Sequence, residues 1–120
     1  MTDTKNSGRV DLAWLMEASH RVAGEKGRWE GGPTFPEQIA LMHSELSEAL
    51  EDYRPHGLVA SRFLRIDESG KPEGIAAEFA DVLLRIANTC QAYNIPLVEA
   101  VLQKHEYNKT RPYRHGNKFC

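Results

Sequence analysis

The sequence predicts an all-α protein: a four-helix bundle that is completed by dimerisation or tetramerisation. Apolar residues recur at helical spacing in four segments, whereas the alternating pattern of a half-buried strand is almost absent. The chain has 120 residues, of which 41% are hydrophobic, and fits a single domain over residues 1–120. A helical chain of this length buries only a modest core, which oligomerisation often completes.

The first helix is expected over about residues 10–26, with Asp11 as its N-terminal cap. Each of the other three is expected to begin at a proline, a residue favoured at the first helical position. Pro36 opens a helix to about residue 53, Pro72 one to about residue 93, and Pro96 one to about residue 109. The sequence 54–57 ends the second helix, and residues 58–66 suit either a short helical turn or a strand. Residues 1–8 and 112–120 are expected to be flexible.

The second and third helices each carry one apolar stripe at helical spacing. In the second helix the stripe residues are Ile39, Met42, Leu46, Ala49, Leu50 and Tyr53. In the third helix they are Ile75, Phe79, Val82, Leu83, Ile86, Cys90 and Tyr93. We expect each stripe to form the buried face of its helix.

The formal net charge of −2 argues against general attraction to DNA or to an anionic membrane surface. Neither a membrane nor a specific nucleic acid is therefore expected as a partner. No apolar run approaches the 18 residues of a membrane span, and the first seven residues are polar. Cys90 and Cys120 lack the CxxC spacing of a zinc or redox site. The expected location is the cytoplasm.

Two pairs of carboxylates flank the apolar stripes: Glu45 and Glu48 on the second helix, Glu78 and Asp81 on the third. Spacing i, i+3 puts the Cβ atoms of a pair about 5–6 Å apart. If the stripes pack together, the four acids converge, and a divalent cation would offset their repulsion. Hard oxygen ligands suit Mg²⁺, with Mn²⁺ as a possible substitute. Alternatively the acids are solvated, and Asp81 pairs with Arg85 at i, i+4.

The segments SELSEA (44–49) and EFADVL (78–83) resemble the acidic motifs of the MazG-like, all-α nucleoside triphosphate pyrophosphohydrolase superfamily. FPEQ (35–38) and the ending YNKTRPYRHGNK (107–118) add to the resemblance, which covers residues 29–118. It implies Mg²⁺-dependent cleavage of a nucleoside triphosphate to the monophosphate and pyrophosphate. Glu45, Glu48, Glu78 and Asp81 would bind metal, and Glu45 or Glu48 would also activate water. The family often has a further glutamate at the position of Ser44, so the catalytic details are open here.

A basic segment near the end of the chain is the expected phosphate-binding region. Lys104, Asn108 and Arg111 share one face of the last helix and its end, and the family pattern assigns them to the nucleotide. Alternatively, the cations complement the helix dipole. Further along, the residues that could close over the triphosphate or remain solvated are Arg114, His115 and Lys118.

Three uncharged residues are expected to contact the nucleotide. Trp29 and Phe35 lie in or beside the loop before the second helix, where aromatic residues of the resembling dCTP pyrophosphatases contact the base. Core or subunit packing is the alternative for both. Asn88 lies two turns beyond Asp81 on the same flank and reaches the nucleotide or is a surface amide. His20 is interpreted as structural or surface.

Three other functions compete with this prediction. The same chemistry could act on phosphoribosyl-ATP. The fold could be a catalytically weak helical interaction module, for which Ser44 is the one hint. The basic tail could bind nucleic acid, although the net charge weighs against it.

Overall fold

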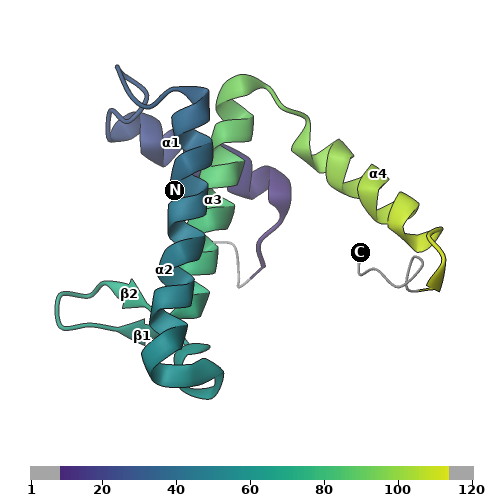
Figure 1. Ribbon diagram of the computed structural model, residues 1–120. Helices are drawn as coiled ribbons and strands as arrows, with labels where there is room; N and C mark the ends of the chain where they lie inside the picture. The colour runs from purple at the N-terminus through teal and green to yellow at the C-terminus, as the bar shows by residue number, and fades with distance from the viewer. Residues whose placement is uncertain (1–8, 114–120) are drawn as a thin grey trace.

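The computed structural model describes residues 9–113, and these are mostly helical (Figure 1). The expectation of a predominantly α-helical chain is confirmed. The elements in chain order are α1 Leu12–Glu25, α2 Phe35–Ser61, β1 Arg65–Ile66, β2 Pro72–Glu73, α3 Ile75–Tyr93 and α4 Leu97–Lys109.

Side-chain caps fix where the first two helices begin. The Asp11 carboxylate accepts a hydrogen bond from the backbone N–H of Trp14 at 2.8 Å, which confirms the cap predicted for α1. In α2, Thr34 and Glu37 form a reciprocal capping box, in which Glu37 Oε1 accepts from the Thr34 N–H at 2.7 Å. The helix therefore starts one residue before Pro36, which lies in its first turn.

The connection between α2 and α3 differs from the prediction in two ways. Helical backbone extends through Pro55, beyond the predicted residue 53, and breaks at Gly57, where φ is 75° and ψ is 166°. The predicted break within residues 54–57 is thus present, and a short helical segment follows it to Ser61. Pro72, expected to open the third helix, lies instead in β2, whose Cα partners in the antiparallel pairing are Arg65↔Glu73 and Ile66↔Pro72. Gly74, with φ of 109°, then turns the chain into α3. The proline was a misleading signal because it suits a strand end as well as a helix start.

α3 is the central element of the molecule. Both α1 and α2 pack against it, whereas α4 makes only sparse contacts with the rest of the described chain and projects away from it (Figure 1). By itself, the chain therefore forms three packed helices of the predicted bundle. No helix among residues 9–113 is long and apolar enough to cross a membrane.

The contacts between the helices are made by small side chains. The buried apolar residues of the described chain are Ala18, Ala23, Ala49, Ala77, Ala87 and Cys90. By contrast, stripe residues that were expected in the core are exposed: Leu46 by 47%, Leu50 by 49%, Phe79 by 51% and Leu83 by 56%. The prediction that these large stripe residues are buried is thus wrong for the single chain. Alanines let two helices approach closely, and the larger side chains remain on the outside.

Candidate functional site

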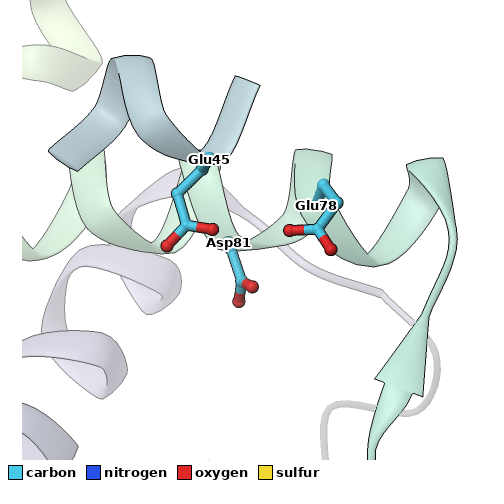
Figure 2. Close-up of side chains that lie close together, drawn as sticks. All are labelled: Glu45, Glu78 and Asp81. Carbon is cyan, nitrogen blue, oxygen red and sulfur yellow. The ribbon is translucent and has the colours of Figure 1, made fainter. Parts of the chain in front are cut away.

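Three of the four predicted metal-binding acids converge where α2 runs beside α3. Oxygen atoms of Glu45, Glu78 and Asp81 all lie within 4.8 Å of one another, and Figure 2 shows the three carboxylates gathered at one place. Opposite oxygens around a Mg²⁺ ion are about 4.2 Å apart, twice the usual bond length. Because three ligands of one octahedral ion include neighbouring oxygens, which lie about 3 Å apart, side-chain movements of about 1 Å would bring these oxygens to bonding distance of one ion.

The fourth acid, Glu48, is exposed and lies beside this cluster rather than within it. Its negative charge and a hydrogen bond with Glu78 both raise the pKa of Glu78. The predicted convergence of the two acid pairs thus holds for three side chains, with Glu48 close enough to act on them electrostatically.

Burial and like charges make Glu78 costly to ionise. The pKa of Glu78 is raised from 4.5 to about 7, first by burial and then by the charges of Glu48 and Asp81. Its Oε1 atom is buried and has no hydrogen-bond partner among the described residues. Burial and the charge of Glu45 also raise the pKa of Asp81. A cation among these oxygens would satisfy the buried atom and offset the repulsion, so the donor set fits a hard divalent metal.

Two cations that were not predicted as site residues lie at the acids. Arg85 donates from Nη2 to Glu45 Oε2 at 3.2 Å, instead of forming the i, i+4 pair with Asp81 considered from the sequence. The positive charges of Arg85 and Lys71 both lower the pKa of Asp81 and so oppose the effect of burial. Lys71 lies in the connection between β1 and β2, directly before β2, and no sequence spacing relates it to the acids.

A large cavity adjoins the acid cluster. It has a volume of about 1190 Å³, and its walls are formed by α1, the loop after it, the first half of α2 and α3. Ligand pockets in proteins commonly measure about 300–1,000 Å³, so this cavity is large enough for a nucleotide. Trp14 Nε1 and Gln38 Oε1 belong to lining residues, are buried and lack hydrogen-bond partners among the described residues. The lining residues that link the cavity to the acid cluster are Glu45, Asp81 and Arg85.

Asn88 and Trp29 both line this cavity, as their expected contact with a nucleotide requires. Asn88 Oδ1 lies 3.0 Å from Trp29 Nε1 and 2.9 Å from His20 Nδ1. His20, interpreted as structural, thus adjoins the candidate site, and no local motif could have shown it. Phe35 does not line the cavity. It packs edge-on against Tyr93, with 5.2 Å between ring centroids, which agrees with the packing role considered as the alternative for this residue.

The expected phosphate-binding residues on α4 are not brought to the acids within one chain. Lys104 and Arg111 instead lie over the ring of Tyr107, at 5.6 and 5.8 Å from its centroid. Lys104 and Asn108 are exposed on the projecting helix. The remaining predicted phosphate contacts lie outside residues 9–113: Arg114, His115 and Lys118.

No protein-family model matches the chain, and comparisons with curated proteins and with solved structures find no significant similarity. A functional assignment therefore depends on the chemistry of the acid cluster and cavity, together with the motif resemblance.

Proposed function

We propose that the protein is a Mg²⁺-dependent nucleoside triphosphate pyrophosphohydrolase, with Mn²⁺ as a possible substitute metal. The observation that carries the proposal is the position of the acid cluster: Glu45 and Asp81, together with Glu78, lie at the edge of a cavity of nucleotide size. The resemblance of residues 44–49 and 78–83 to the MazG-like acidic motifs supports this chemistry. The reaction converts a (d)NTP and water to a (d)NMP and pyrophosphate.

The residues divide the work of the reaction between them. Glu45, Glu78 and Asp81 would hold the metal, with Glu48 close beside them. When bound, Mg²⁺ would neutralise phosphate charge and lower the pKa of a coordinated water. The water oxygen would bond to the α-phosphorus while Glu45 or Glu48 takes its proton. The bond from the α-phosphorus to the oxygen that bridges to the β-phosphorus would break, and pyrophosphate would leave. Most phosphoryl-transfer catalysis comes from positioning and charge stabilisation, which this arrangement can provide.

Arg85 is a further cation that would act on the substrate. It lines the cavity and already donates to Glu45, so a bound triphosphate would compete for its guanidinium. Release of Glu45 from Arg85 would free a carboxylate oxygen for the metal. Substrate and metal would then favour each other's binding.

The test is pyrophosphate release from each of the eight common NTPs and dNTPs, with Mg²⁺ and with Mn²⁺, and from phosphoribosyl-ATP. We expect turnover that depends on the metal and falls by at least about 100-fold in Asp81→Asn and Glu78→Gln. Glu17→Gln, at an exposed glutamate on α1, is the matched control and should retain wild-type activity.

Each outcome assigns the protein to one class. Efficient turnover of phosphoribosyl-ATP alone would identify that compound as the substrate. Release of orthophosphate without pyrophosphate would exclude cleavage between the α- and β-phosphates. No turnover of any nucleotide at high protein concentration would refute the enzyme and favour the catalytically weak interaction module.

We also propose that a second copy of the chain, as a homodimer or within a homotetramer, covers the exposed stripes of α2 and α3. No large apolar side chain of the described residues is fully buried, and Leu46, Leu50, Phe79 and Leu83 are each about half exposed. Because about half of each side chain is already buried, covering the rest stabilises an assembly by about 0.7–1.5 kcal/mol each. A second copy also offers its own α4, whose Lys104 and Asn108 are not engaged with the acids of their own chain.

Light scattering with size-exclusion chromatography tests this assembly. The wild-type mass should be at least twice that of the 120-residue chain, and Leu83→Asp should lower it. Val59→Asp, at a residue that is 77% exposed near the end of α2, is the matched apolar control and should leave the mass unchanged. A monomeric wild-type protein at micromolar concentration would contradict the proposal.

A further inference from the structure

The ion pair between Arg85 and Glu45 joins the cavity wall to the acid cluster. Arg85 Nη2 on α3 donates to Glu45 Oε2 on α2 at 3.2 Å. Only 30% of the Arg85 side chain and 15% of the Glu45 side chain are exposed. Water and salt screen a partly buried pair less than a surface pair, so this bond is stronger than an ordinary surface ion pair.

Glu45 is at the same time a candidate metal ligand. Its carboxylate lies with those of Glu78 and Asp81, with oxygens within 4.8 Å of one another (Figure 2). The positive charge of Arg85 also lowers the pKa of Asp81, so the guanidinium acts on two acids of this cluster. A guanidinium and a divalent cation are attracted by the same carboxylates and repel each other. Arg85 is therefore a counter-ion of the acids that belongs to the protein itself.

The bond to Glu45 leaves part of the Arg85 guanidinium without a partner. Its Nε atom is buried and has no hydrogen-bond partner within residues 9–113. The N–H groups of a guanidinium form a rigid fork that matches the oxygens of a phosphate. Because Arg85 lines the cavity, the phosphate chain of a ligand there can replace Glu45 as its partner.

Resting on the proposed function, we propose that Arg85 regulates the site as an internal competitor of the metal. Its guanidinium holds Glu45 and weakens metal binding until the polyphosphate chain of the substrate draws it away. The affinity of the free protein for Mg²⁺ is accordingly low, and the protein takes up the metal together with a nucleotide. Arg85 acts on the metal through Glu45 and is in this respect a positioning residue.

The first arm of the test measures Mn²⁺ binding without nucleotide by isothermal titration calorimetry. Arg85→Gln keeps a hydrogen-bond donor but removes the charge, and it should bind Mn²⁺ roughly tenfold more tightly than the wild type. Arg85→Lys retains the charge and should bind the metal with nearly wild-type affinity. Lys71→Gln is the matched control, because it removes a positive charge that acts on Asp81 but forms no bond to Glu45, so its effect should be clearly smaller.

The second arm measures binding of inorganic tripolyphosphate in the presence of a chelator. Glu45→Gln weakens the hold on Arg85 and should bind tripolyphosphate roughly tenfold more tightly than the wild type. Glu48→Gln removes a negative charge beside the same cluster but no bond to Arg85, so its effect should be clearly smaller. Arg85→Gln should bind tripolyphosphate more weakly. The two arms use different variants, so either arm decides if the variant of the other does not fold.

Unchanged or weaker Mn²⁺ binding in folded Arg85→Gln would overturn the inference, because Arg85 would then support Glu45 as a ligand or act on the substrate alone. Equal effects of each variant and its charge control would overturn it as well, since general electrostatics would then suffice. Neither result affects pyrophosphate release by the wild-type protein. Failure of the wild type to release pyrophosphate from any nucleotide would refute the proposed function itself, and the inference would fall with it.

Discussion

Replacing Glu78 by glutamine should stabilise the metal-free protein at alkaline pH, although the residue belongs to the candidate site. Burial and neighbouring acids raise the pKa of Glu78 from 4.5 to about 7, so its negative charge is unfavourable in the folded state. Each pKa unit corresponds to about 1.36 kcal/mol, which gives about 3 kcal/mol as an upper limit for the cost of ionisation. Access of solvent to this half-buried side chain reduces the expected gain to about 2 kcal/mol.

The pH dependence has a definite sign. Because the folded pKa is raised, the contribution of Glu78 to stability is complete below about pH 4.5 and is lost as the pH rises to about 7. Glutamine does not titrate, so the difference between Glu78→Gln and the wild type should grow over this range and be constant above pH 8. At about 4 °C per kcal/mol, the melting temperature of the variant should be about 8 °C higher at pH 8.

Thermal unfolding in the presence of a chelator, followed by circular dichroism at one fixed protein concentration, provides the measurement. Saturating Mg²⁺ should make the wild-type protein the more stable of the two. Ligand at 100 times its Kd stabilises the wild type by about 2.7 kcal/mol, and the variant binds Mg²⁺ more weakly. Glu17→Gln, at an exposed glutamate, should show no pH-dependent difference from the wild type. A wild-type protein that is more stable than Glu78→Gln at pH 8 without metal would refute this reasoning.

Three further substitutions test how the site is supported. Asp52 accepts from Arg65 at 2.8 Å, and this bond lowers its pKa. Asp52→Asn should therefore reduce the melting temperature at pH 7, and the difference from the wild type should shrink as the pH falls below the ordinary pKa of aspartate. Gly74→Ala should reduce the free energy of unfolding, measured in urea, by about 1–3 kcal/mol, because φ is 109° and the added Cβ meets a backbone carbonyl oxygen. Gly24→Ala is the control, since a Cβ at Gly24 in α1 meets open space, and an equal effect of both substitutions would contradict this cause. Thr34→Ala removes one half of the capping box and should reduce the free energy of unfolding by about 1 kcal/mol in the same assay. A variant as stable as the wild type would contradict a stabilising role of the capping box.

Much of the fold was predictable because helix formation depends on neighbouring residues. Apolar periodicity located the four helices, and Asp11 marked the beginning of the first one. The spacing i, i+3 likewise placed Glu78 and Asp81 on one flank of α3. The connection before α3 was less predictable, since Pro72 is compatible with either element and its pairing with Ile66 depends on a hairpin of only two residues per strand.

The candidate metal ligands could be identified from the sequence motifs, whereas their surroundings depend on tertiary packing. Arg85 reaches Glu45 across 40 positions of the chain, and Asn88 lies 68 positions from His20. Such contacts depend on how far each helix is rotated and shifted along its neighbour, and side-chain packing between helices sets both quantities. Periodicity likewise identified the apolar stripes of α2 and α3 but not which of their residues are buried. The helices pack through small side chains such as Ala49 and Ala77, and this packing leaves the larger stripe side chains exposed.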